Sequence, residues 1–135
     1  MAKKIFINLP VTDLPGAMAF YAAVGFVNNP AFTDETAACM VWSEEIYVML
    51  LTREKFAFFT AKKIADTRET AAVINSLAMD SLEEMNRFAE NALAAGAVET
   101  KEPVDMGFMQ QRSLSDPDGH LWEVVYMDMS QLPHN

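Results

Sequence analysis

The sequence is poor in three residue types on which many protein functions depend. It has one cysteine (Cys39), two histidines and five glycines among 135 residues. A lone cysteine cannot form an intrachain disulfide and is typical of the reducing cytoplasm, which is the location we expect. Five scattered glycines supply no glycine-rich phosphate loop, which argues against hydride or phosphoryl transfer. Cys39 stands in the apolar run AACMVW and is expected in the core, where cysteine behaves as a small hydrophobe.

Positive charge is scarce as well. Ten lysines and arginines stand against nineteen acids, a formal net charge of −9. Nucleic acid and anionic membrane surfaces repel such a chain, so neither is an expected partner. The apolar run IYVMLL at 46–51 is far too short to span a bilayer, and the apolar run before Pro10 is too short for a signal peptide.

An internal repeat organises the chain, which at 135 residues is most simply one domain over 1–135. The segments 11–27 and 79–98 both begin with an acid before a leucine and continue with helical periodicity. Each then ends at a glycine, Gly25 or Gly96, which fits a helix C-terminus. Two amphipathic helices can resemble each other by chance, but the matched order of strands around them favours duplication.

Strand-like runs surround each predicted helix. They lie at 4–11, 26–32, 36–43 and 46–52 in the first half, and at 71–79, 97–103, 107–115 and 120–127 in the second. The pattern predicts an α+β fold of two βαβββ modules, at about 1–52 and 71–128. Pro15 near the start of the first helix and the capping box that begins at Ser81 support the helix assignments.

The connector at about 53–70 is too long for an ordinary loop and has helical character. It carries Phe56, Phe58 and Phe59 within four residues. Such a cluster is a hydrophobic plug on the core, an interface patch or, less commonly, a lid over a ligand cavity.

Glu123 is an acid inside the apolar run HLWEVVYM, directly after the turn sequence DPDG. Side chains of a strand alternate between faces, so Glu123 shares a face with Leu121 and Val125, while His120 lies on the other. If DPDG forms a four-residue hairpin loop, Arg112 stands roughly opposite Glu123. The acid is then either half of a structural ion pair or, without a cation, a carboxylate whose raised pKa suits a general base.

The strand and helix INLPVTDLPGAMAFYAAVGF, the half-chain repeat and the closing DPDGHLWEV resemble the vicinal-oxygen-chelate superfamily of glyoxalases, bleomycin-resistance proteins and extradiol dioxygenases. The run DETAACMVWSEEIYVMLLTREKF resembles bacterial proteins described as predicted lactoylglutathione lyases. The resemblance implies that both modules curl into a half-open curved mixed sheet with the helices on its outer face. It also implies a homodimer.

In metal-using members of this superfamily, the first and last strands of each module supply the ligands. The matching positions here are Phe6, Met49, Ile74 and Glu123. Only Glu123 is a usual ligand, because Zn²⁺ and Ni²⁺ favour several imidazole, thiolate or carboxylate donors together. No metal site and no cofactor are therefore expected, and a divalent ion is disfavoured.

We predict that the barrel instead encloses an apolar pocket with a few polar anchors, which is the usual composition of a small-molecule site. The predicted pocket residues are Phe6, Asn8, Met49, Ile74, Ser76, Gln110, Arg112 and Glu123. Asn8 and Ser76 can equally be ordinary hydrogen-bonded groups, and Trp42 either lines the pocket or packs under the helices. The favoured function is binding of a small organic molecule without a metal. The alternatives are a metal-assisted, glyoxalase-like lyase with Glu123 as its catalytic residue, or a purely structural dimer.

Overall fold

The computed structural model describes residues 2–131, so one of the two histidines, His134, lies outside the described residues. The chain divides into two compact units, unit 1 (Met1–Asp66) and unit 2 (Thr67–Asn135). Within the described range, no helix is both long and apolar enough to cross a membrane.

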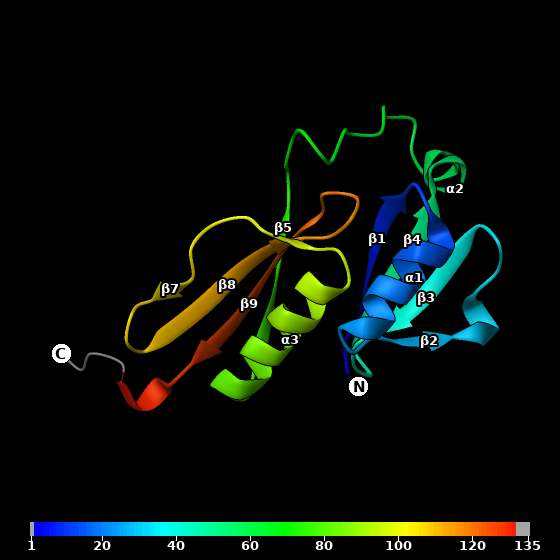
Figure 1. Cartoon of the computed structure of the whole chain (residues 1–135). Coiled ribbons are helices and arrows are strands. Elements are labelled where there is room, and N and C mark those ends of the chain that lie inside the picture. Colours follow the sequence, from blue (N-terminus) through cyan, green and yellow to red (C-terminus); the bar gives the residue numbers. More distant parts are fainter. Residues whose placement is uncertain (1, 132–135) are drawn as a thin grey trace. The chain divides into compact units, whose positions relative to one another are not determined.

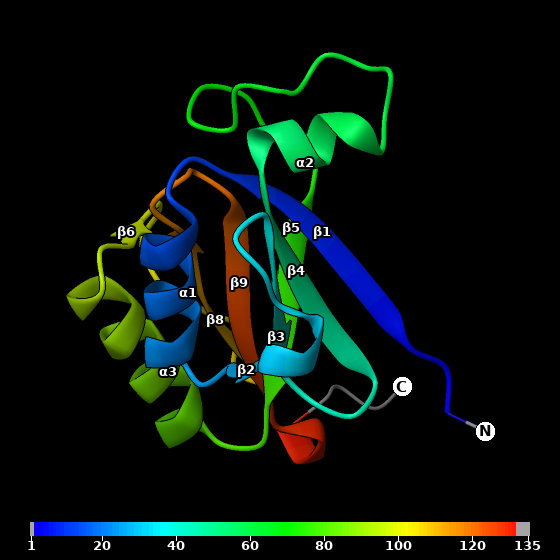
Figure 2. The same cartoon turned by 90° about the vertical axis from the view of Figure 1, so that its right-hand side faces the viewer.

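Unit 1 is a four-stranded mixed sheet with the order β1-β4-β3-β2 (Figure 1). Its first and last strands, β1 and β4, run parallel, and the other pairs are antiparallel. The elements are β1 (Ile5–Val11), α1 (Leu14–Ala23), β2 (Val27–Asn29), the 3₁₀ helix η1 (Pro30–Phe32), β3 (Ala37–Val41), β4 (Ile46–Thr52) and α2 (Arg53–Phe58). The short helix α2 follows β4 directly (Figure 2).

Unit 2 repeats this topology. Its strand order is β5-β9-β8-β6, and the parallel pair is again formed by the first and last strands, β5 and β9. The elements are β5 (Ile74–Met79), α3 (Leu82–Ala94), β6 (Val98–Glu99), β7 (Val104–Asp105), β8 (Met109–Ser115), β9 (Leu121–Met127) and the 3₁₀ helix η2 (Met129–Gln131). Of the strand expected over 97–103, only the two residues of β6 are extended, and β7 follows just beyond the predicted range. Both β6 and β7 pair with β8. The α+β class and the two βαβββ modules are confirmed, and both sheets are mixed.

Local signals in the sequence set the helix boundaries. The side chain of Asp13 caps α1, and Ser81 Oγ accepts the Glu84 N–H at 3.0 Å to cap α3. Both helices end before a glycine with positive φ, Gly25 at 114° and Gly96 at 111°, a conformation that costs glycine little. The predicted cap and stop positions are confirmed.

Each main helix covers one face of its own sheet. In unit 1 the buried strand residues alternate, as Val48 and Leu50 do on β4, and α1 contributes Phe20 and Tyr21 to the same core. In unit 2, Trp122 and Val124 of β9 are buried on the face that α3 covers, with Met85 and Phe88 of α3. Burying such side chains stabilises the fold by roughly 1.5–3 kcal/mol each. The intervening residues lie on the opposite face of each sheet, where most of them are less buried.

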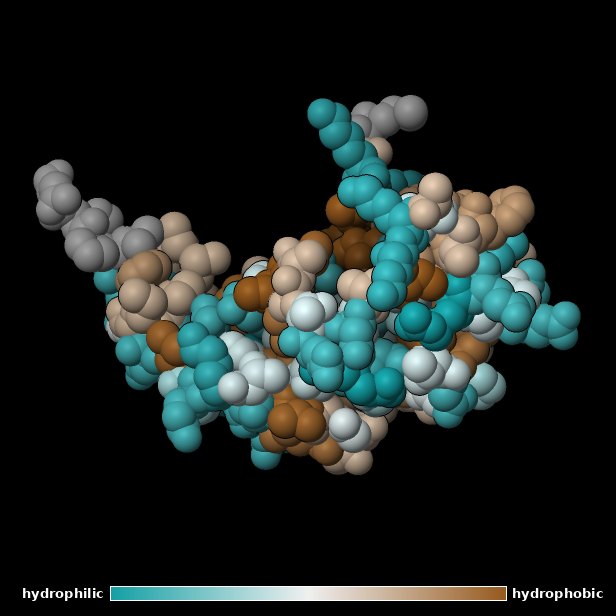
Figure 3. All heavy atoms as spheres, turned by 90° about the horizontal axis from the view of Figure 1, so that it is seen from above, coloured by the Kyte–Doolittle hydropathy of each residue, from teal (hydrophilic) through white to brown (hydrophobic). Residues whose placement is uncertain are grey.

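The connector is helical only at α2, and two of its three phenylalanines are exposed. Phe58 and Phe59 are 79% and 64% exposed, and the Lys55 ammonium lies over both rings at 5.6 and 5.7 Å. Hydrophobic residues also show among hydrophilic ones on the surface in Figure 3. The expectation of a core plug is wrong for these two side chains, and the interface and lid interpretations stay predictions.

The turn between β8 and β9 differs from the expected four-residue loop. Ser115 pairs with Leu121, so the loop spans five residues, 116–120. Asp116 Oδ1 accepts the backbone N–H groups of Asp118 at 3.0 Å and of His120 at 2.9 Å. The Asp116 carboxylate therefore satisfies two backbone N–H groups inside the loop and stabilises its five-residue form.

Gly119 should be far less tolerant of substitution than Gly107. Both have positive φ, 89° and 82°, so both Ala variants carry the same left-handed cost of about 1–2 kcal/mol. A Cβ on Gly119 would stand 2.3 Å from the Thr67 carbonyl oxygen, whereas one on Gly107 would meet nothing within 4 Å. Urea denaturation should therefore show that Gly119→Ala loses roughly 1–3 kcal/mol more stability than Gly107→Ala. Equal losses would contradict this account of the turn.

Candidate functional site

The predicted pocket residues separate by unit and by sheet face. Phe6, Asn8 and Met49 lie on the face of the unit 1 sheet opposite α1, where Asn8 and Met49 are cross-strand partners. Ile74, Ser76 and Glu123 share the face of the unit 2 sheet opposite α3, where Ser76 and Glu123 are partners. We call the sheet face opposite the main helix the open face of each unit. Each unit thus brings together three of the predicted residues on its open face.

Unit 1 has a hollow on this face with a volume of about 520 Å³. Its walls are formed by Lys4, Phe6, Asn8, Asn29, Phe32, Cys39, Tyr47 and Met49. The Phe6 and Tyr47 rings are stacked, with centroids 4.5 Å apart and an interplanar angle of 11°, and the Lys4 ammonium lies 5.8 Å from the Tyr47 ring centre. The hollow is therefore an aromatic and thioether surface with one cation at the Tyr47 ring.

Besides the Lys4 ammonium, two asparagine side chains bring polar groups to the hollow. Asn8 Nδ2 donates to the Phe6 carbonyl at 3.4 Å, and Asn29 Oδ1 accepts the Ala31 N–H at 3.1 Å. The Asn29 amide nitrogen makes no hydrogen bond within residues 2–131 and remains a donor for a bound molecule. Cys39 is buried as expected, and burial raises its pKa. Its protonated thiol is an apolar part of the wall.

Trp42 does not line the hollow. Its ring centre lies 4.9 Å from that of buried Phe26. Of the two alternatives for this residue, the structure supports packing.

Unit 2 carries a polar group of side chains that we term the Glu123 cluster: Ser76, Gln111, Ser113 and Glu123. Ser76 Oγ donates to Glu123 Oε1 at 3.0 Å, and Gln111 Nε2 donates to Glu123 Oε2 at 3.2 Å. Ser76 and Ser113 are the strand partners of Glu123 on its two sides. Neutral donors thus hold both oxygens of the carboxylate.

The expected ion pair between Arg112 and Glu123 is wrong. The five-residue turn shifts the β8–β9 register by one residue, so Arg112 stands opposite Val124. Such a shift moves every side chain of a strand to the other face. Gln110, opposite Tyr126, is likewise on the α3 face, and neither it nor Arg112 shares the face of Glu123. Gln111 and Ser113 occupy that face instead, and sequence reasoning missed both.

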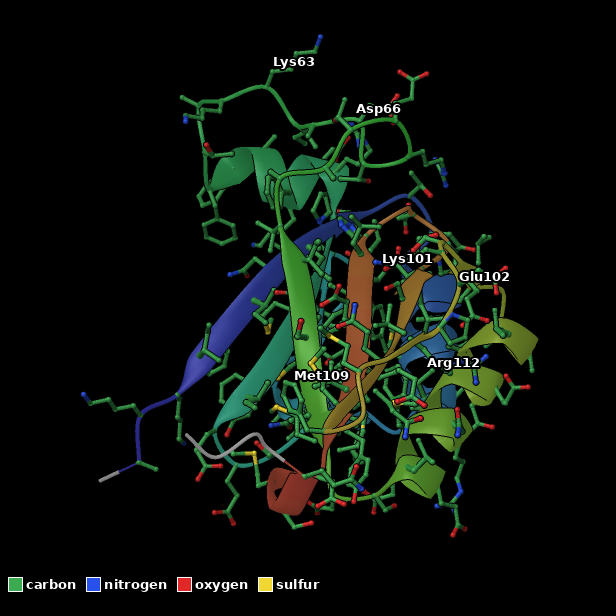
Figure 4. The ribbon with its side chains drawn as sticks, turned by 90° about the vertical axis from the view of Figure 1, so that its left-hand side faces the viewer. Lys63, Asp66, Lys101, Glu102, Met109 and Arg112 are labelled. Carbon is green, nitrogen blue, oxygen red and sulfur yellow. The ribbon has the colours of Figure 1, made fainter. Side chains whose placement is uncertain are left out.

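Arg112 is bound on the α3 side of the sheet (Figure 4). Its guanidinium donates to Glu99 at 2.9 Å, to Glu90 at 2.9 Å and to Asn86 at 3.2 Å. Glu99 and, to a lesser extent, Glu90 raise the pKa of Arg112, and the Arg112 hydrogen bonds lower the pKa of Glu99. The arginine joins α3, β6 and β8, and its charge is neutralised there.

The donor set does not fit the divalent metal that the superfamily resemblance implies. The partners of Glu123 are a hydroxyl and an amide, and the other three ligand positions hold Phe6, Met49 and Ile74. Across residues 2–131, no three His, Cys, Asp or Glu side chains gather where a metal ion could be held. One carboxylate with neutral neighbours is a weak site for a transition metal.

No family model matches the sequence, and no curated protein matches it. Solved structures do match. A glyoxalase/bleomycin resistance protein/dioxygenase family enzyme from Burkholderia phytofirmans PsJN is 18% identical, with a TM-score of 0.79 over 93% of this chain and 99% of that one. The bleomycin resistance determinant encoded on the transposon Tn5 is 21% identical, with a TM-score of 0.64 over 94% and 99%. Fosfomycin resistance protein FosX from Mesorhizobium loti is 13% identical, with a TM-score of 0.70 over 96% of each chain.

Replacing Arg112 should lower the stability of the fold much more than replacing Glu123. Arg112→Met leaves Glu99 half-buried without its cation and should lower the free energy of unfolding by roughly 2–3 kcal/mol at pH 7. Glu123→Gln preserves side-chain shape at an open face and should cost less than about 1 kcal/mol. Urea denaturation of both variants gives the comparison, and similar losses would restore a structural role for Glu123.

The Arg112 effect should also depend on pH. Because the folded pKa of Glu99 lies below its ordinary value of 4.5, the pair stabilises the fold above that value. The stabilisation is lost as pH falls through the lower, folded pKa. The difference in the free energy of unfolding between wild type and Arg112→Met, measured by urea denaturation, should have its full size above pH 4.5 and should become smaller at lower pH. A difference that does not change with pH would contradict this account.

Proposed function

Because the chain has the glyoxalase/bleomycin-resistance fold of the vicinal-oxygen-chelate superfamily, as its sequence led us to expect, we propose that it binds a small organic molecule without the usual metal. The proposed site is the hollow on the open face of the unit 1 sheet. We further propose that the protein acts as a cytoplasmic homodimer, in keeping with its single cysteine and the superfamily resemblance.

The observation that carries the proposal is the composition of the hollow. Its volume of about 520 Å³ is within the range of roughly 300–1,000 Å³ typical of ligand sites. The stacked Phe6 and Tyr47 rings offer a flat surface, and Met49 adds an adaptable thioether. Asn8 and Asn29 provide the few polar groups that orient a ligand.

Exposure supports the same proposal. Phe6 is 52% exposed and Phe32 69% exposed, although both are large hydrophobic side chains. Covering them with an apolar ligand would contribute about 25 cal/mol for each Å² removed from water. Two of the structural neighbours are named for resistance to bleomycin and to fosfomycin, and both names refer to organic compounds.

The aromatic dye anilinonaphthalene sulfonate is a suitable first probe, because its rings match the stacked pair and its sulfonate suits Lys4. Phe6→Ala should weaken dye binding by about three- to tenfold, since aromatic contacts contribute roughly 0.5–1.5 kcal/mol beyond their buried area. Phe58→Ala is the matched control, because it removes an exposed ring from α2 that lies outside the hollow. A fluorescence titration gives both affinities. If Phe58→Ala weakens binding and Phe6→Ala does not, the dye binds at α2 and the proposal fails.

A metal-assisted, glyoxalase-like lyase is the second candidate, favoured by one observation. Glu123 is held at an open face by Ser76 and Gln111, as a reactive carboxylate would be. Calorimetric titration of metal-stripped protein with Ni²⁺ and Zn²⁺ separates the two functions. We expect no binding tighter than about millimolar, because a single carboxylate is a poor transition-metal site. Micromolar binding that disappears in Glu123→Gln would establish the lyase as the better proposal.

A further inference from the structure

The Glu123 cluster points to a second binding site, which is formed by residues of unit 2 and does not depend on the function proposed for the hollow of unit 1. We propose that this face of unit 2 binds the primary ammonium group of an organic cation. The carboxylate of Glu123 supplies the opposite charge, and Ser76, Gln111 and Ser113 supply further hydrogen-bond acceptors. The hydrocarbon part of the ligand lies on the apolar residues along the same strands.

The first argument is charge. No ion pair within 4.0 Å involves Glu123 among the described residues. Arg112, the arginine nearest in sequence, is committed to Glu90 and Glu99 on the other face. Both hydrogen bonds that the carboxylate receives come from neutral groups. No cation of the described residues therefore neutralises the Glu123 carboxylate. A cationic ligand at this face can form a charge-assisted hydrogen bond with it.

The second argument is the kind of hydrogen-bonding group that the cluster leaves open. Ser76 donates its single hydroxyl hydrogen to Glu123, so its oxygen is left as an acceptor. Gln111 uses its amide nitrogen on Glu123, which leaves the amide oxygen as an acceptor. An ammonium group has three donors and no acceptor, so it complements this set.

Ser113 is the third and independent argument. It is 6% exposed, and its hydroxyl has no hydrogen-bond partner within residues 2–131. It stands directly opposite Glu123 in the β8–β9 pair, on the same face. A buried hydroxyl without a partner costs free energy unless something satisfies it. A bound ammonium group at Glu123 is a donor of the right kind at the adjacent position.

Apolar residues lie on both sides of the cluster along the strands. Ile74 pairs with Leu121 two positions before the Ser76–Glu123 pair, and Ala78 pairs with Val125 two positions after it. Ile74 is 56% exposed on this face. A ligand whose charged end meets Glu123 can therefore lay an aryl or alkyl body on these side chains. The net charge of −9 attracts such cations to the protein.

Phenethylamine is the probe, and phenethyl alcohol, with the same body and no charge, is its matched control. Titrations of the full chain followed by amide NMR shifts should show phenethylamine binding at about millimolar affinity, as expected for a fragment of this size. The shifts should centre on residues 76, 111, 113 and 123. Phenethyl alcohol should bind at least tenfold more weakly.

Variants test the role of each group. Glu123→Gln should weaken phenethylamine binding at least tenfold, and Ser113→Ala should weaken it two- to fivefold. Glu83→Gln, which removes an exposed acid of α3, should leave it unchanged. Equal affinity for the amine and the alcohol, or an undiminished affinity in Glu123→Gln, would overturn the proposal. Either result leaves the dye titration of the hollow unaffected, because that site is lined by unit 1 residues alone.

Discussion

The two hydrogen bonds that Asp116 accepts in the β8–β9 turn decide which side chains of unit 2 can meet. By holding the N–H groups of Asp118 and His120, this carboxylate forms a loop of five residues rather than four. Thr67 Oγ1 adds a hydrogen bond of 2.6 Å to the Asp118 carbonyl. The register of the hairpin follows from the loop, and the composition of both sheet faces follows from the register.

The two faces consequently hold opposite arrangements of charge. On the α3 face, Arg112 is surrounded by Glu90 and Glu99, and the pairing joins a helix to two strands. On the open face, Glu123 is hydrogen-bonded but has no cation among residues 2–131. With a loop one residue shorter, the arginine would neutralise Glu123 and the acids of the α3 face would lose it. The same turn thus stabilises one face and leaves the other with an unpaired charge.

Most of the fold was predictable from local patterns. Strand alternation, the Ser81 cap and the terminal glycines are properties of short segments, and each was confirmed. The site was predictable only where a residue's face follows from its own strand, as for Phe6 and Glu123. The partner of Arg112 depended on the length of the β8–β9 turn, because one additional residue in the loop moves the β8 side chains to the opposite face relative to β9. Asn29 and Phe32 of the hollow lie at a 3₁₀ segment with no periodic signal, so sequence reasoning did not find them.

The strand order has a consequence for how the chain is made. In each unit the strand synthesised last, β4 or β9, lies between two strands that precede it. The earlier strands must therefore leave space at the centre, and neither sheet can be completed until its final strand has left the ribosome. Pairings between residues so far apart in sequence slow folding, because a long loop is closed before any contact forms. A nascent unit 2 that stops before β9 exposes the inner edges of β5 and β8, which are templates for misassembly.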